Sequence, residues 1–435
     1  MNIREIFLHH ALGVTPKALK TVVSNTHIQT TGENFMKKSL IAAALLGTFA
    51  ASAFAAPSVT LYGRIDTGLV YTHKNLDNAA GSTDTFSMDS GVTTGSRWGL
   101  KGTEDLGNGL KVGFILESGF NADDGTQSVS GTMFNREASL NVMGPFGQLS
   151  LGKIGAITQG TSSWGKVGAV SAFGTSYGAA NVGNATNVFA ATVGVMDNTI
   201  AYQTPKFAGF TVYAQYSMGS SKAASQNSEG KWTQTMVENE SSTDRYYALG
   251  ATYANGPVNL YFAVDSVNYA SYFDKTGTTT TPSTKDMDDS LTVAFGGSYD
   301  FSVVKVFAGA QYFDEVLVSK VSGLSNVGLD SLGKMKGYAL QASASAPLAG
   351  GTGYFGVGYV DSSEADSVVT GKEFDLKYYV ASVGYKYDLS KRTNVYGVLS
   401  YAKGEQDIAT PSANFDYSDR KPSMVGFGVG LRHNF

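Results

Sequence analysis

The chain ends with the stretch Val425-Gly-Phe-Gly-Val-Gly-Leu-Arg-His-Asn-Phe435, in which apolar side chains occupy every second position. Successive side chains of a β-strand point to opposite faces of the sheet, so this period predicts a strand with one apolar face. A soluble protein gains little by ending on such a strand. We therefore expect Val429 and Leu431 to face lipid.

The same two-residue period continues through the chain after residue 56. Val59, Leu61 and Ile65 share one face of the first segment, while Arg64 and Asp66 share the other. Counting such segments predicts sixteen strands. They are expected at residues 59–72, 94–103, 109–121, 132–143, 146–153, 198–205, 209–218, 243–254, 257–270, 288–300, 303–315, 335–346, 351–362, 375–389, 392–404 and 422–435.

The connections between these strands alternate between short turns and long loops. The long loops are expected at residues 73–93, 122–131, 154–197, 219–242, 271–287, 316–334, 363–374 and 405–421. Short turns at one end and long loops at the other are typical of an outer-membrane barrel, and an even strand number lets the first strand pair with the last. The sequence therefore predicts an all-β fold, a 16-stranded antiparallel transmembrane β-barrel.

Aromatic side chains gather beside the predicted short turns. In a bilayer they would form an interfacial girdle, although tyrosine and phenylalanine favour any strand. The group comprises Tyr202, Phe207, Phe210, Tyr253, Tyr299, Phe301, Tyr385 and Tyr387.

Composition excludes several classes of protein. The 435 residues include 52 Gly and no Cys, so disulfide scaffolds, thiol nucleophiles and Cys-ligated metal sites are ruled out. The net charge of −4 gives no support for nucleic-acid binding. Only His73 and His433 follow residue 56, and no nucleotide-binding or serine-hydrolase motif occurs. We expect no enzyme activity, no cofactor and no metal site.

The N-terminal region reads as a targeting segment. Residues 36–55 combine a lysine pair, an apolar run and the small-residue cleavage site Ala53-Phe-Ala55, which predicts a signal peptide. Residues 1–35 are expected to be a misassigned upstream extension; the alternative is an extended signal peptide. The barrel would then occupy residues 56–435 with a formal charge of −7, because residues 1–55 carry five basic and two acidic side chains.

Several motifs carry a family resemblance. They are VTLYGRID (59–66), SRWGLKGTEDLGNGL (96–110), FNR (134–136), LSLGK (149–153), NTIAYQTP (198–205) and GLRHNF (430–435). Together they resemble the general trimeric porins of Gram-negative outer membranes, over essentially all of residues 57–435.

This resemblance implies a function and a set of partners. It implies a homotrimer embedded in outer-membrane lipid and lipopolysaccharide, and a water-filled channel for passive diffusion of small hydrophilic solutes and inorganic ions. It also implies that the terminal segment, with Phe427, Val429, Leu431 and Phe435, is read by the outer-membrane assembly machinery. The third external loop, 154–197 here, is expected to fold into the barrel and narrow the pore.

Ion selectivity would depend on charge at that narrowing. Arg97 and Arg136 match family positions on the basic wall, and Arg64 and Lys101 fall on the inward parity. Arg136 is ambiguous, because it shares its parity with outward-facing positions. The remaining candidates for the constriction are Lys153, Lys166, Asp66 and Glu117.

The third loop has an unusual charge pattern. Lys153 and Lys166 are the only charges between Ala138 and Met196. We therefore expect a weak to moderate preference for anions. Lys153 stands where many relatives have Arg, and Met196 where anion-selective relatives often have Arg, which weakens the expected preference.

Three alternatives stay open. Arg64 and Arg97 could form lumen salt bridges with Asp66 or Glu117 that serve only barrel stability. The same barrel could be a substrate-specific channel. The chain could also be a secreted β-rich adhesin.

Overall fold

The computed structural model describes residues 58–77, 81–160, 162–174, 188–219, 224–226, 232–234, 238–239, 243–269, 288–317, 320–321, 334–364, 374–408 and 419–435. The segments predicted at 1–35 and 36–55 lie outside them, and the first strand begins at Ser58. No helix in these described residues is long and apolar enough to cross a bilayer.

The described chain is almost entirely strand. Its elements are β1 (Ser58–Asn75), β2 (Ser82–Ser90), β3 (Arg97–Gly107), β4 (Leu110–Gly119), β5 (Glu137–Gly144), β6 (Gly147–Gly155), η1 (Val167–Val170), β7 (Val195–Gln203), β8 (Phe210–Ser217), β9 (Ala224–Gln226), β10 (Trp232–Gln234), β11 (Arg245–Asn255), β12 (Val258–Asn268), β13 (Leu291–Asp300), β14 (Lys305–Leu317), β15 (Lys334–Leu348), β16 (Gly351–Glu364), β17 (Phe374–Asp388), β18 (Thr393–Ile408) and β19 (Ser423–Asn434).

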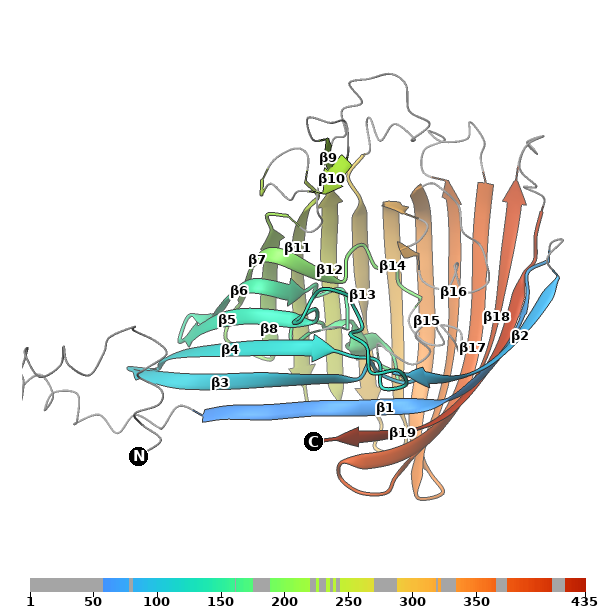
Figure 1. The fold of residues 1–435 in the computed structure, drawn as a ribbon, viewed down its shortest axis with the longest axis horizontal. Coiled ribbons are helices and arrows are strands. Elements are labelled where there is room, and N and C mark those ends of the chain that lie inside the picture. The colour runs from blue at the N-terminus through green and yellow to red at the C-terminus, as the bar shows by residue number, and fades with distance from the viewer. Residues whose placement is uncertain are drawn as a thin grey trace, which may run out of the picture. The chain divides into compact units, whose positions relative to one another are not determined.

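The main sheet closes on itself as an antiparallel barrel (Figure 1). β1 pairs with β19 from Arg64 opposite Asn434 to Asn75 opposite Ser423, so the first and last strands are neighbours. β2 and β3 both pair with β1 and are two halves of one barrel strand. Counting them as one strand gives the predicted sixteen. Closure leaves no free sheet edge around the barrel, as a membrane-spanning sheet requires.

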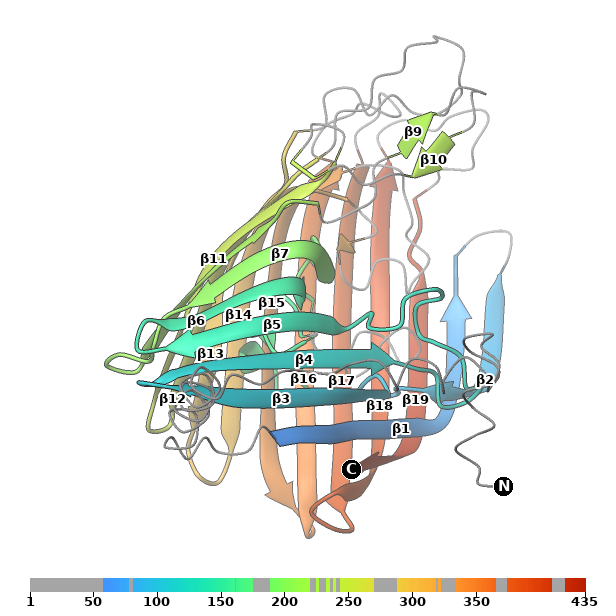
Figure 2. The ribbon, with the colours of Figure 1, turned by 60° about the vertical axis from the view of Figure 1, so that its left-hand side comes forward.

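Two departures from the predicted strands exceed four residues. Residues 82–90, predicted as part of a long loop, form β2 and pair with the second half of β1 (Figure 2). Their sequence, STDTFSMDS, is mostly polar, so the apolar alternation that identifies a strand is weak there. β5 was expected from residue 132 but begins at Glu137, because Asn135 uses its side chain to accept a hydrogen bond from the Gly119 amide at 2.8 Å.

The outer surface of the barrel is apolar. On β12, Leu260 and Phe262 are exposed, whereas the alternating Tyr261, Ala263 and Asp265 are buried inside. Large apolar side chains stay exposed elsewhere too, such as Phe295, with 56% of its surface accessible. A soluble protein buries such side chains, so this surface is built to contact lipid.

Aromatic side chains form a belt near each end of this apolar surface. The predicted belt beside the short turns is present, and Phe207, Phe301 and Tyr387 are among its exposed members. A second belt, including Tyr379, lies toward the long loops. Tyr379 and Tyr387 share β17 and are eight residues apart, about 26 Å along the strand. Strand tilt reduces this separation to roughly 20 Å, close to the apolar height of outer-membrane barrels.

Candidate pore constriction

The long connection between β6 and β7 enters the barrel and lies against its inner wall. Its described parts are residues 156–160, 162–174 and 188–194, and they include the short helix η1. Ile157, Trp164 and Val170 are almost completely buried and belong to the core inside the barrel. The third loop therefore folds inward, as predicted.

One buried carboxylate holds both ends of this loop. Asp265 on β12 accepts hydrogen bonds from the hydroxyls of Thr158 at 2.7 Å and Thr192 at 3.0 Å. Two wall residues, Tyr246 and Thr292, also donate to it. An ionised carboxylate is costly to bury without such donors, so these bonds fix the loop relative to β12.

Three inward-facing glutamines attach the loop farther around the wall. Each uses its amide oxygen to accept from a loop amide and its amide nitrogen to donate to a loop carbonyl. Gln215 pairs in this way with Ile157 and Gly155 at 2.9 and 3.0 Å. Gln311 binds both backbone groups of Ala190, at 2.6 and 3.1 Å, and Gln341 binds Val188 and Val170.

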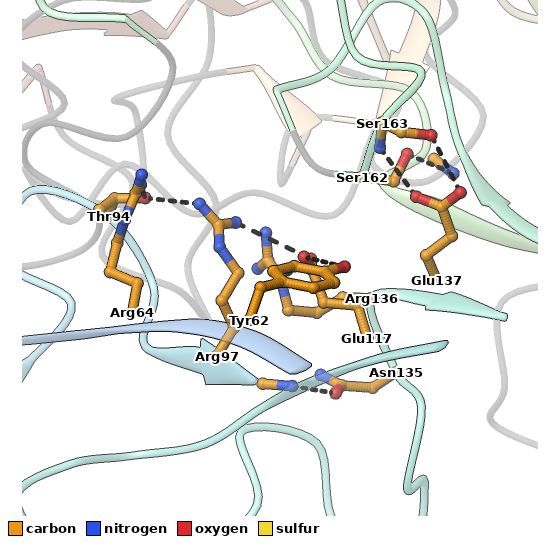
Figure 3. A network of polar contacts seen from close by, with 12 residues as sticks. Tyr62, Arg64, Thr94, Arg97, Glu117, Asn135, Arg136, Glu137, Ser162 and Ser163 are labelled. Atoms are coloured by element: carbon orange, nitrogen blue, oxygen red, sulfur yellow. Dashed lines mark hydrogen bonds and ion pairs between the residues drawn. The ribbon is translucent and has the colours of Figure 1, made fainter. Parts of the chain in front are cut away.

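A second carboxylate anchors the loop near β5. Glu137 is 1% exposed and accepts hydrogen bonds from the Ser163 amide at 2.8 Å and hydroxyl at 2.9 Å. Figure 3 shows this contact beside the charged residues of the wall. Lys166 lies three residues farther along, 5.3 Å from the ring centroid of Tyr213. Burial lowers the pKa of its ammonium group, and Glu137 opposes that shift.

Arginines from three parts of the wall converge beside this anchor (Figure 3). Arg136 donates from Nε to Oε1 of Glu117 at 2.7 Å, and Nη1 of Arg97 lies 3.9 Å from the same oxygen. The Tyr62 hydroxyl donates to the other Glu117 oxygen at 3.1 Å. Arg64 donates from Nε to Asn434 at 2.7 Å. Two guanidinium groups thus approach the Glu117 carboxylate, and the third, that of Arg64, lines the same cavity.

A cavity of about 370 Å³ separates this wall from the loop. The wall contributes charged side chains, and the loop contributes small ones. The lining residues on which the argument depends are Arg64, Arg97, Lys101, Glu117, Ser162 and Ser163. An ion in the cavity therefore meets three basic groups and the carboxylates of Glu117 and Glu137 on the wall side, and hydroxyls and backbone on the loop side.

Comparison with known proteins agrees with this architecture. The family model described as Gram-negative porin matches residues 42–407. The chain belongs to this family. It is 34% identical to an outer membrane porin protein of Bordetella pertussis over 92% of this chain and 100% of the relative. It is also 32% identical to outer membrane porin protein 32 of Delftia acidovorans, again over 92% and 100%.

Solved structures show the same fold. The anion-selective porin from Comamonas acidovorans superimposes with a TM-score of 0.60 at 25% identity, covering 87% of this chain and 100% of that one. The protein is thus a porin of the outer membrane, and its barrel forms a water-filled channel. Members of this family and fold are channels.

The structure brings most of the predicted site residues of this porin together. Arg64, Arg97, Lys101 and Glu117 line the cavity, and Arg136 contacts Glu117. The parity ambiguity of Arg136 disappears because it precedes β5, so the alternation of that strand does not apply to it. Of the salt bridges considered above, Arg97 and Arg136 do pair with Glu117. Among the described residues, no ion pair joins Arg64 to Asp66.

Three residues are placed differently from the expectation. Lys153 is in register with Ala138 on the outward parity and pairs with Asp197, so it faces away from the lumen. The bulge between Gly152 and Ile154 interrupts the β6 pairing there. Asp66 is completely buried, and Met196 is packed into the core with no exposed surface. An arginine at 196 would meet packed side chains rather than the pore.

The sequence interpretation missed several residues around the cavity. Arg432 faces inward on β19, in register with Asp66, and the outward positions of Val429 and Leu431 already implied this. Glu137 and Thr94 carried no such signal. Their partners, Ser163 and Arg64, are more than twenty residues away in the sequence, and Thr94 itself lies outside a regular strand.

Proposed function

We propose that this porin is a diffusion channel with a weak to moderate preference for anions, set where Arg64, Arg97 and Arg136 face the inward-folded loop. The observation that carries the proposal is the balance of charges there. Arg64, Arg97 and Lys101 line the cavity, and Arg136 adds a fourth basic group on Glu117. The two carboxylates of the lining are Glu117, which Arg136 and Arg97 approach, and Glu137, which Ser163 binds. No Asp or Glu occurs between Ala138 and Met196 to offset them. The similar solved structure from Comamonas acidovorans is named an anion-selective porin, which supports a preference for anions over cations here.

Transport of this kind needs no catalytic group, and we propose none. A permeating ion is stabilised by the field of nearby charges, and low-dielectric walls strengthen that field. Lys101 adds a further positive charge, 5.2 Å from the ring centroid of Tyr62. Lys166 lies on the loop side and contributes only at the margin, since its ammonium donates to the Ser163 carbonyl.

Reversal potentials in a salt gradient test this proposal. Arg97→Ser should lower the permeability of anions by roughly five-fold in dilute salt, the effect of one unit charge about 4 Å from an ion in a water-like dielectric, and should lower the anion-to-cation ratio by at least that factor. Arg392→Ser is the matched control, because Arg392 lies in the exposed turn between β17 and β18. Cation selectivity of the wild-type channel would overturn the proposal.

We also propose the homotrimer and the lipopolysaccharide-rich setting that the family resemblance implies. The outward-facing Lys153–Asp197 ion pair supports a subunit contact at β6 and β7, since charged groups on a lipid-facing surface are costly. Native mass spectrometry of detergent-extracted protein tests the trimer. A purely monomeric mass under conditions that preserve the folded barrel would contradict it.

A further inference from the structure

A short segment between β2 and β3 also bends into the lumen. It comprises residues 91–96, and within it Val92, Thr93, Thr94 and Ser96 are buried. Gly91 begins it with a φ of 73°, a left-handed conformation that glycine adopts without steric cost. The break therefore directs the segment inward, where a continuous strand would have kept it in the wall.

Asp66 of β1 fastens this segment in place. Its carboxylate accepts hydrogen bonds from the hydroxyls of Thr93 and Tyr396. Its backbone carbonyl accepts from the Gly91 amide at 2.7 Å and from the Ser96 hydroxyl at 3.0 Å. Side chain and backbone of one residue thus bind both ends of the segment. An inward side chain on β1 would otherwise face the water-filled lumen. The segment 91–96 covers Asp66 and so explains its burial.

The segment also meets the third loop. Val92 packs with Phe173 of that loop and with Val70 and Val398 of the wall in a small apolar cluster. Two inward elements from different parts of the chain therefore contact each other inside the barrel. Residues 91–96 are held by a buried carboxylate on one side and by apolar packing on the other.

Thr94, at the middle of the segment, connects two of the arginines. Its Oγ1 accepts a hydrogen bond from Nη1 of Arg64 at 3.2 Å and another from Nη2 of Arg97 at 3.3 Å. A hydroxyl oxygen has two acceptor lone pairs, so it can serve both donors at once. Figure 3 shows Thr94 close to Arg64 and joined to Arg97 by one of these bonds.

Like charges repel, so two guanidinium groups stay side by side only where something fixes each of them. Arg64 has Asn434 on one side, and Arg97 has Glu117 at the longer distance of 3.9 Å. The Thr94 hydroxyl is the single described group that bonds to both. Its position depends on the backbone of residues 91–96, and that backbone is fixed by Asp66.

We propose that Thr94 is a positioning residue for ion selectivity: the inward segment 91–96 is a second constriction element, and its threonine hydroxyl holds Arg64 and Arg97 together at the pore. This rests on the proposed function, because it assigns the arrangement of the same basic wall. The proposal adds the uncharged Thr94 hydroxyl to the groups that determine selectivity. It gives the buried Asp66 the role of holding the segment that carries Thr94.

Thr94→Val removes the acceptor and keeps the shape of the side chain. We expect the barrel to fold normally, since Thr93 and Ser96 still bind Asp66. The anion-to-cation permeability ratio should fall about two-fold in dilute salt, as the freed charges move a few ångströms from the ion path. Thr94→Ser keeps the hydroxyl and should behave like the wild type. Thr103→Val, on the adjoining strand β3, is the matched control.

Each outcome is decisive. The proposal is overturned if Thr94→Val keeps the wild-type ratio, or if Thr94→Ser is disturbed as strongly as Thr94→Val. Failure of both Thr94→Val and Thr94→Ala to give a folded barrel would also overturn it, because the hydroxyl would then serve barrel stability. The comparison is made relative to the wild type. A cation-selective wild-type channel would refute the proposed function. The change in permeability ratio from wild type to Thr94→Val would still test the role of Thr94 by itself.

Discussion

The substitution Asp265→Asn tests whether the buried carboxylate fixes the third loop. It preserves size and one acceptor oxygen but removes the negative charge. Four donors now converge on this carboxylate, two from the loop, Thr158 and Thr192, and two from the wall. The loop should therefore detach more often in the variant, while the ladder of strand hydrogen bonds keeps the barrel closed.

The magnitude follows from the two loop bonds. A hydrogen bond to a charged group contributes about 1.5–3 kcal/mol, and a neutral one about 0.5–1.5 kcal/mol. Changing both loop bonds from charged to neutral should weaken docking by about 2–3 kcal/mol. Since about 1.4 kcal/mol corresponds to a factor of ten, the detached population should rise roughly 30- to 140-fold.

Limited trypsin digestion reports this population. Lys166 is the only Lys or Arg between residues 154 and 196, and it is partly buried in the docked loop. When opening is fast relative to cleavage, the cleavage rate follows the population of the open form. Mass spectrometry should therefore detect a rise in cleavage after Lys166 of about the same factor in Asp265→Asn.

A control separates loop detachment from general loosening of the barrel. Ser382→Ala removes a buried hydrogen bond of 3.0 Å between two wall residues, Ser382 and Ser400, and leaves the described loop contacts intact. Cleavage after Lys166 should stay at the wild-type rate in this variant. An unchanged rate in Asp265→Asn, or an equal rise in both variants, would refute the assignment of Asp265 as the anchor of the loop.

Three further predictions concern assembly and maturation. Gly63→Ala should sharply reduce the heat-modifiable folded form, because a Cβ there would lie 2.2 Å from the Phe435 ring and 2.7 Å from the Arg97 carbonyl oxygen; a normal folded yield would contradict this packing. Leu431→Arg should also impair insertion, by up to ~2–4 kcal/mol near the bilayer midplane and less near the interface, because Leu431 is exposed on the outer face; Leu431→Val is the control. The mature protein should begin at Ala56 by intact-mass measurement, and a chain retaining residues 1–35 would disprove the signal-peptide assignment.

The strands could be predicted from the sequence because a lipid-facing barrel has a simple pattern. Each strand alternates between a lipid-facing and a lumen-facing side chain, and the short turns often contain residues suited to positive φ. Asn108 and Gly109 illustrate this, with φ values of 53° and 77°. The break between β2 and β3 also begins at a residue of positive φ, Gly91, but a single glycine does not predict an inward turn. It depends on Asp66, twenty-five residues before Gly91, and on Tyr396 near the other end of the chain.

The wall of the constriction was partly predictable for the same reason. Arg64, Arg97 and Lys101 share the inward parity of regular strands, so the pattern places them in the lumen. The pattern fails where the strand is irregular. Arg136 precedes β5, so its side chain departs from the direction that simple alternation gives, whereas Lys153, at the bulge of β6, keeps the outward parity of Leu151 and was assigned to the pore against that alternation.

The net charge of the chain is negative, whereas the proposed preference is for anions; the two differ because the net charge includes groups that lie far from the pore. Salt screens exposed charges beyond about 8 Å, so the acidic surface that makes the mature chain negative acts weakly inside the barrel. Asp265 and Glu137 are buried and accept hydrogen bonds from the third loop. Asp66 is buried and accepts a hydrogen bond from the segment 91–96. The arginines remain at the cavity, while most nearby carboxylates hold its walls in place. Under the proposed function, buried carboxylates hold the constriction together and the arginines set its charge, so the net charge of the sequence does not predict the selectivity.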